Sequence, residues 1–119
     1  MTPEEFVLGI RRGVLEDNFT IYRKSFDRSA STSDGRDTDS PQMASFYESL
    51  TEDQQQRFMG YVRQIIVDTI ANVFAVLDGV NTPEKDWDYF HLTHNAECPE
   101  PPDLNGDLSD IFLGAEEEE

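Results

Sequence analysis

Apolar residues recur at helical spacing along most of the chain, and the clearest series follows Thr51. Thr51 and Gln54 form a capping-box sequence, which starts a helix, and Gly79 is a natural stop. The positions between them fall at steps typical of one helix: Phe58, Val62, Ile65, Ile66, Thr69, Ile70, Val73, Phe74 and Leu77. The sequence therefore predicts a long helix over residues 52–78, about 40 Å at roughly 1.5 Å per residue.

This predicted helix is as long as a whole domain of this size. A compact domain of 119 residues has a radius of gyration near ~13.5 Å and a diameter of roughly 35 Å, so the helix must span or overhang it. Residues 73–77 are apolar almost all round the helix and need more than one neighbour. Two interpretations stay open: a central core helix, or a helix at the seam of a homodimer.

A helix with a bend is predicted at the N-terminus. Thr2 and Pro3 suit the first positions of a helix, and an apolar stripe begins at Phe6. Beyond Gly13 the stripe shifts round the helix, which indicates a bent or two-piece helix ending near Asp27. Arg11, off the stripe, is expected to point elsewhere.

Between the two predicted helices lies a polar stretch. Residues 28–42 contain no apolar residue except Ala30 and are dense in Ser, Asp and Thr, so we predict a mobile loop. It serves either as a solvated connection or as a partner-binding or modification loop. A short helix over residues 43–50 is predicted to follow it. We predict a single domain over residues 1–115 and an acidic, solvated tail over 116–119.

The pattern changes in the C-terminal part of the chain. Residues 87–94 are rich in aromatic and β-favouring side chains with partial alternation, which is typical of a strand. Residues 104–108 resemble a turn that leads to a second short element over 108–113. We therefore predict an α+β fold: a mainly helical domain with a small C-terminal antiparallel strand pair on the long helix.

Composition supports a folded domain in a reducing compartment. The chain is 37% hydrophobic and 11% aromatic, which distinguishes it from a disordered acidic segment. Cys98 is the only cysteine, so no internal disulfide is possible. The acidic N-terminus does not resemble a secretory signal, and no uninterrupted apolar run reaches the length of a membrane span. We predict a cytoplasmic protein without membrane contact.

Negative charge is concentrated in the C-terminal half. The formal net charge is -16, and past Arg63 there are fourteen acidic residues against one basic residue, Lys85. Such a surface attracts basic proteins and repels nucleic acid. We predict that a basic partner protein binds through carboxylates fixed among apolar anchors: Asp86, Asp88, Asp103, Asp107 and Asp110.

Two groups of residues resemble metal sites only in part. His91, His94 and Cys98 are possible zinc ligands, but on a strand the two histidines point to opposite faces and no second cysteine is present. Residues 103–110 resemble the start of a calcium loop, but Leu108 stands where an EF-hand requires glycine. We predict no metal, no cofactor and no catalytic residue.

The resulting functional prediction is a non-enzymatic interaction domain. A basic partner bound by charge complementarity fits an immunity or antitoxin-type inhibitor. Two alternatives stay open. One is a DNA mimic that inhibits a DNA-binding protein, and the other is a ligand-binding or catalytic domain with a pocket near Trp87 and His91.

Overall fold

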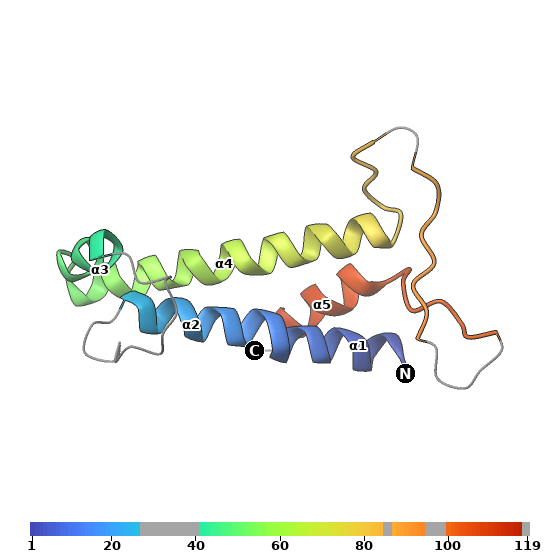
Figure 1. Ribbon diagram of the computed structural model, residues 1–119, viewed down its shortest axis with the longest axis horizontal. Coiled ribbons are helices and arrows are strands. Elements are labelled where there is room, and N and C mark those ends of the chain that lie inside the picture. The colour runs from blue at the N-terminus through green and yellow to red at the C-terminus, as the bar shows by residue number, and fades with distance from the viewer. Residues whose placement is uncertain (27–40, 85–86, 95–99, 118–119) are drawn as a thin grey trace.

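The computed structural model describes residues 1–26, 41–84, 87–94 and 100–117, and all its regular structure is helical (Figure 1). The N-terminal helix is continuous through α1 (Pro3–Ile10), the π-helical turn η1 (Arg11–Glu16) and α2 (Asp17–Phe26). It is followed by α3 (Pro41–Glu48), the long α4 (Glu52–Leu77) and α5 (Leu108–Glu117). Counting α1, η1 and α2 as one bent helix, the described residues form four helices.

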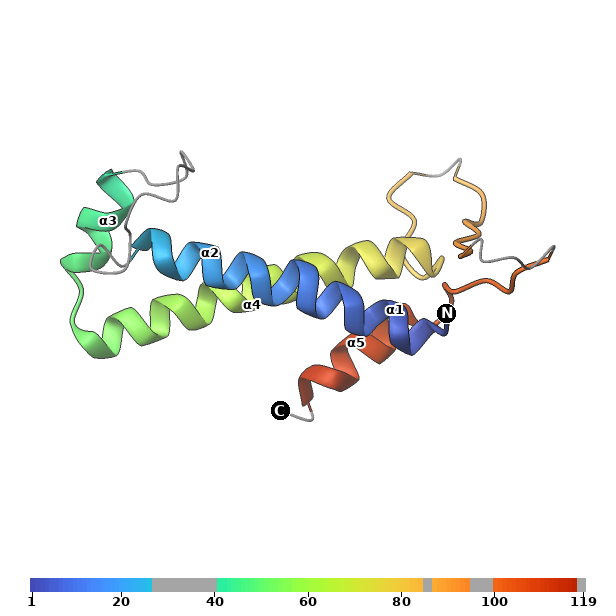
Figure 2. The same cartoon turned by 60° about the horizontal axis from the view of Figure 1, so that its bottom comes forward.

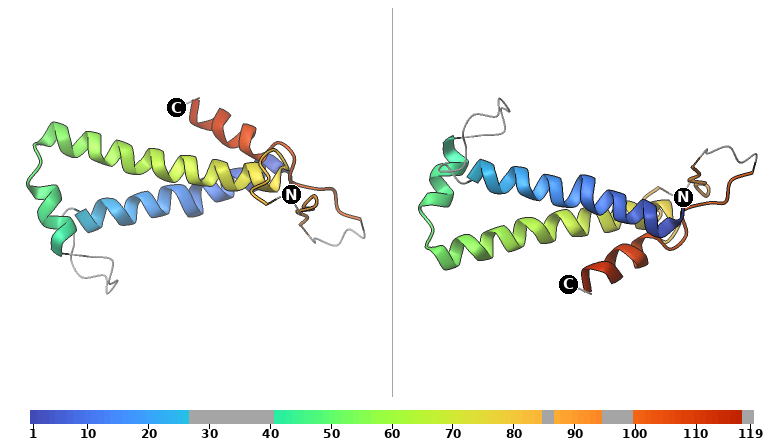
Figure 3. Two further views of the ribbon diagram at one scale, coloured as in Figure 1. Left: turned by 90° about the horizontal axis from the view of Figure 1, so that it is seen from above. Right: turned by 90° about the horizontal axis from the view of Figure 1, so that it is seen from below.

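The two long helices lie along the longest axis of the molecule. Helix α4 runs beside the N-terminal helix, α3 crosses one end, and α5 packs at the other (Figure 1). Seen from above and below, α2 and the first half of α4 spread apart toward α3 (Figure 3). The molecule extends 53 × 31 × 30 Å, and its radius of gyration of 17.9 Å exceeds that expected for a compact sphere. Two long helices that lie antiparallel along the longest axis explain the difference (Figure 1).

The predicted bend of the N-terminal helix is confirmed, and its cause is local. Over Arg11–Glu16 the helix has π-type hydrogen bonding. A π turn contains more residues than an α turn and therefore rotates the following side chains round the helix axis. Val7 before the turn and Leu15 within it are both fully buried. This rotation accounts for the shift of the apolar stripe beyond Gly13.

The predicted long helix is also confirmed, together with its capping box. The Gln54 N–H donates to Thr51 Oγ1 at 3.2 Å, and the Thr51 N–H donates to Gln54 Oε1 at 3.0 Å. The helix ends at Leu77, and Gly79 adopts a φ of 78°, a conformation that favours glycine. By length and composition alone, α4 could cross a membrane; 17% of its most apolar window is buried in the described structure.

The interior consists of two clusters at opposite ends of α4. The main core lies where α1, η1, α4 and α5 meet. It contains Val7, Leu15, Val67, Ala71, Phe74, Leu108 and Phe112. The second cluster joins α2, α3 and α4 through aromatic rings, with Phe26 and Phe58 edge to face at 5.0 Å. Tyr47 and Phe46 complete it at 5.6 Å from Phe26 and Phe58 respectively. The main core joins the N-terminal helix to α4 and α5, and the aromatic cluster joins α2 and α4 to α3, which crosses their ends (Figure 2).

The prediction of an α+β fold with a C-terminal strand pair is wrong. Residues 87–94 are extended but lie in no strand, and the second predicted strand is helix α5. Leu108 and Phe112 are four residues apart and both fully buried, and this spacing places them on one face of a helix. Without a neighbouring strand, residues 87–94 have no ladder to join.

The predicted mobile loop over residues 28–42 falls mainly outside the described residues. Its last two positions, Pro41 and Gln42, begin helix α3. The short helix is therefore confirmed two residues earlier than expected, and residues 27–40 are not described.

Candidate partner-binding site

Asp78 connects the end of α4 to the start of α5. Its Oδ1 accepts hydrogen bonds from the Gly106 N–H at 2.6 Å and the Leu108 N–H at 3.1 Å. Its Oδ2 accepts the Ser109 N–H at 2.9 Å. A carboxylate at a helix N-terminus satisfies unpaired N–H groups and interacts favourably with the helix dipole. Asp78 therefore fixes the position of α5 at the end of α4.

Substitution of Asp78 by alanine should lower stability through loss of this cap. We expect Asp78→Ala to reduce the free energy of unfolding by about 1–2 kcal/mol. Urea denaturation followed by circular dichroism measures the change. Asp68→Ala is the matched control on the same helix, where Asp68 is exposed and accepts only a side-chain bond from Gln64 at 2.8 Å. Equal loss in both variants would contradict the capping role.

Asn105 holds the extended segment against the end of α4. Its Nδ2 donates to the Leu77 carbonyl at 2.6 Å and to the Phe90 carbonyl at 2.7 Å. Its Oδ1 accepts the Leu92 N–H at 2.8 Å, and the Leu104 N–H donates to the Leu92 carbonyl at 2.7 Å. One amide side chain thus satisfies backbone groups that a strand partner would otherwise bind. The position of residues 90–92 depends on it.

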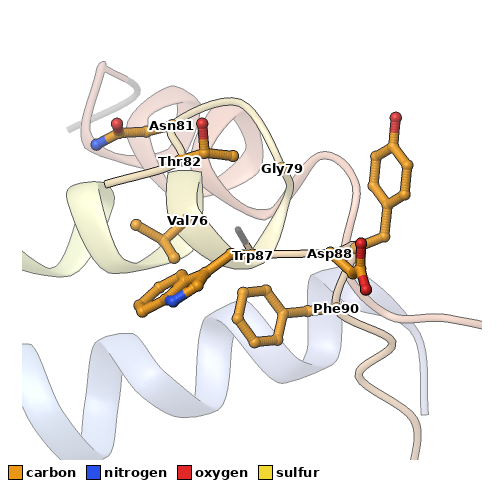
Figure 4. A pocket seen from close by; sticks show the side chains of 8 residues that line it. Val76, Gly79, Asn81, Thr82, Trp87, Asp88 and Phe90 are labelled. Atoms are coloured by element: carbon orange, nitrogen blue, oxygen red, sulfur yellow. The ribbon is translucent and has the colours of Figure 1, made fainter. Parts of the chain in front are cut away.

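The extended segment presents aromatic side chains at the surface. Trp87 and Phe90 pack edge to face with ring centroids 5.7 Å apart. Both rings face the end of α4 that carries Val76 (Figure 4). Even so, 45% of Trp87, 40% of Phe90 and 85% of Tyr89 remain exposed. Exposed aromatic groups of this kind are typical of interaction sites.

A cavity separates this segment from the end of α4. Its volume is about 270 Å³, and its lining consists of Val76, Gly79, Asn81, Thr82, Trp87, Asp88, Tyr89 and Phe90 (Figure 4). A more open hollow of about 470 Å³ is lined by residues 87–90 alone. His91 and His94 do not line either space. The cavity is thus lined by aromatic and aliphatic side chains together with the polar side chains of Asn81, Thr82 and Asp88.

Four of the five predicted partner-binding aspartates lie in the described residues, and all four are exposed. Asp88 lines the cavity, and Asp103 Oδ2 lies 2.9 Å from His91 Nδ1. Asp107 and Asp110 stand at the start of α5, where the Asp107 carbonyl accepts the Ile111 N–H at 2.9 Å. Asp86 lies outside the described residues. The segments that carry the four meet at one end of the molecule (Figure 1).

The same end receives further negative charge from helix α1. Glu4 and Glu5 are exposed on its first turn, and α1 packs against α5, which follows Asp107 and carries Asp110 in its first turn. The first ten residues contain no Lys or Arg, and past Arg63 only Lys85 is basic. Acidic side chains therefore predominate at the end of the molecule that carries the exposed aromatic residues.

A cluster of two arginines and two glutamates ties the three main helices together. Glu116 Oε2 lies 2.6 Å from Arg11 Nη1, and Glu116 Oε1 pairs with Arg63 Nη1. Arg63 Nη2 also lies 2.8 Å from Glu16 Oε1. The prediction that Arg11 points away from the core is wrong, since its side chain is 7% exposed and its guanidinium lies 5.7 Å from the centre of the Phe112 ring.

Glu116 belongs to this cluster and to helix α5, not to a solvated tail, and its side chain is 18% exposed. Desolvation is the largest single influence on the Glu116 carboxyl and raises its pKa. Hydrogen bonds and charges from Arg63 and Arg11 together outweigh desolvation, so the pKa lies below its ordinary value. The Arg63 pKa is raised, mainly by its hydrogen bond to Glu116.

The possible metal ligands of the sequence do not gather in the described residues. His91 pairs with Asp103, His94 is exposed, and Cys98 lies outside the described part. Within residues 1–26, 41–84, 87–94 and 100–117, no group of three or more His, Cys, Asp or Glu side chains is arranged to hold a metal ion. In the region of the possible calcium loop, Asn105 binds backbone groups and Asp107 begins a helix.

Sequence reasoning missed Asp78, Asn105 and Glu116. Asp78 follows a helix and precedes a glycine, so the sequence indicates only the C-terminal end of α4. In the structure its carboxylate caps the N-terminus of α5. Asn105 precedes Gly106 and reads as a turn residue. The helical spacing of Leu108, Ile111 and Phe112 is the one signal that could have placed Glu116 in a helix.

Comparison of the chain with models of protein families, with curated proteins and with solved structures finds no match.

Proposed function

We propose that this chain is a non-enzymatic interaction domain that binds a basic partner protein at its acidic, aromatic end. The observation that carries the proposal is the exposed pair Trp87 and Phe90, which lies over a cavity of about 270 Å³ beside the carboxylate of Asp88. Aromatic anchors supply binding energy in protein interfaces, and surrounding charges guide the approach of the partner.

The combination of apolar and acidic groups indicates the chemistry of the partner. An Arg or Lys side chain can place its aliphatic stem against Trp87 and its charge beside Asp88 or Asp103, since long basic side chains have an apolar stem. A DNA mimic requires carboxylates at phosphate-like positions and gains nothing from exposed rings. The exposed aromatic residues therefore favour a domain that binds a basic protein through apolar anchors over a DNA mimic that occupies the DNA-binding site of its target.

Affinity capture from the native source, at low and high salt, tests the proposal. We expect the wild-type chain to retain a basic protein that salt elutes. The purified partner should then bind Trp87→Ala/Phe90→Ala at least about tenfold more weakly, as expected for anchor residues. Tyr22→Ala is the control, because Tyr22 is an aromatic residue of α2 that is 40% exposed, as Phe90 is.

The charge contribution has its own test with the same purified partner. Asp88→Lys should slow association several-fold at low salt, and the difference from wild type should shrink as salt screens it. Asp17→Lys makes the same charge change at an exposed position of the N-terminal helix and should have little effect. Capture of no basic protein, or equal binding by the anchor variant and its control, would refute the proposal.

A further inference from the structure

Helix α4 carries a second exposed apolar surface, separate from the partner-binding end. Tyr61 is 67% exposed, Ile65 65% and Val73 55%, and Thr69 between them is also exposed. These residues, here called the outer row, follow one another at four-residue steps and so lie along one ridge of the helix. The N-terminal helix and α5 pack on the other side of α4 (Figure 1).

The outer row is almost free of charge. Between Gly60 and Leu77 the only charged residues are Arg63 and Asp68. Arg63 is directed toward Glu16 and Glu116, and Asp68 accepts a hydrogen bond from Gln64 at 2.8 Å. A chain with net charge -16 therefore exposes one long apolar strip, and such a strip is typical of an interface.

We infer that the outer row is the contact surface of an antiparallel homodimer. A two-fold axis between Ile65 and Thr69 places Tyr61 of one copy opposite the partner's Val73, and Ile65 opposite the partner's Thr69. The row is thus self-complementary, as a two-fold interface requires. Because its members are four residues apart, the two copies of α4 should cross at about −50°, the angle at which such ridges interdigitate.

The charge distribution selects this occupant and this direction. In the antiparallel arrangement the two Asp78 positions lie roughly 33 Å apart along the helices, at about 1.5 Å per residue, well beyond the Debye length of ~8 Å. Arg57, with a side chain 71% exposed, comes to the level of the partner's Leu77, next to its acidic end. A parallel pair would instead bring both acidic ends together. The apolar centre and the separated charges therefore fit a second copy.

The size of the surface sets the expected strength. Burying the exposed parts of Tyr61, Ile65 and Val73 in both copies removes on the order of 700 Å² from water, and flanking residues bring the total near the ~1,000 Å² of a specific interface. We therefore expect a dimer with a dissociation constant in the micromolar range, about 10⁻⁶ to 10⁻⁴ M.

Analytical ultracentrifugation over a concentration series tests the inference. The wild-type mass should rise from 13.6 kDa toward twice that value. Ile65→Glu should remain monomeric, with the melting temperature that wild type shows at concentrations too low for dimerisation. Leu8→Glu is the matched control on α1, where Leu8 is 45% exposed, and should dimerise like wild type. A wild-type chain that stays at 13.6 kDa up to about 1 mM, far above the expected constant, would overturn the inference.

Cysteine cross-linking tests the direction, in chains that also carry Cys98→Ser. Tyr61→Cys mixed with Val73→Cys should form a disulfide, whereas each variant alone should form little. Strong cross-linking of each variant with itself would indicate a parallel pair and overturn the arrangement. The remaining alternative is that the outer row binds a lipid surface, and flotation with phosphatidylcholine vesicles tests it. If the wild-type chain is monomeric and floats with the vesicles while Ile65→Glu does not, the outer row binds lipid and the dimer inference is overturned. None of these results bears on the partner-binding end.

Discussion

Glu116→Gln should lower the free energy of unfolding by about 3 kcal/mol, because it removes one carboxylate from between two arginines. The amide keeps the size of the side chain and one acceptor oxygen but carries no charge. Arg11 is the sensitive partner, since its side chain is 7% exposed and it lies against Phe112. A buried guanidinium that loses one of its carboxylate partners has little bulk water to replace that charge.

Urea denaturation at neutral pH measures this loss. Glu117→Gln is the matched control: it makes the same chemical change one residue along α5, at an exposed side chain. We expect the control to lie within about 0.5 kcal/mol of wild type, as is usual for surface substitutions. If the two variants were equally stable, the cluster would contribute nothing beyond an ordinary surface charge.

The pH dependence of the same variant follows from the lowered Glu116 pKa. Because the folded pKa lies below the ordinary value of 4.5, the stabilisation is fully present above pH 4.5 and is lost as pH falls through the folded pKa. The stability difference between wild type and Glu116→Gln should therefore be constant near neutral pH and shrink below pH 4.5. A difference that stays constant into this acid range would contradict the assigned cause.

The elements that the sequence predicted correctly are those with signals in neighbouring residues. The capping box of Thr51 and Gln54 and the regular apolar spacing after it define α4 without reference to the rest of the chain. The shift of the apolar stripe at Gly13 likewise predicted the bend, although not the π turn that produces it. Local hydrogen bonding and local spacing decide both features.

The errors concern contacts between distant parts of the chain. Residues 87–94 favour a strand by composition, but a strand also requires a neighbouring strand. The predicted neighbour, residues 108–113, is part of helix α5, as the spacing of Leu108 and Phe112 indicates. The four described aspartates of the candidate site lie at exposed positions, as aspartates usually do, and their role in partner binding stays a prediction. Glu116 was misassigned because its contact with Arg11 joins residues 105 positions apart.

Asn105→Ala should cost about 2–3 kcal/mol and should also release the aromatic segment. The substitution removes the donor to the Leu77 and Phe90 carbonyls and the acceptor for the Leu92 N–H. Each partly buried backbone group left without a partner costs about 1–3 kcal/mol, reduced where water can enter. The main core does not contain Asn105, so we expect the helices to remain folded.

Trp87 fluorescence and hydrogen exchange distinguish this local effect from general unfolding. We expect the Trp87 emission to shift to longer wavelength and the Leu92 amide to lose protection, while the amides of α4 around Val67 remain protected. Asn18→Ala, at an exposed position of α2, is the control. Because Trp87 and Phe90 must be held in place to act as anchors, Asn105→Ala should also weaken binding of the basic partner. Unchanged fluorescence would mean that the segment is positioned by its own packing, through the edge-to-face contact of Trp87 with Phe90.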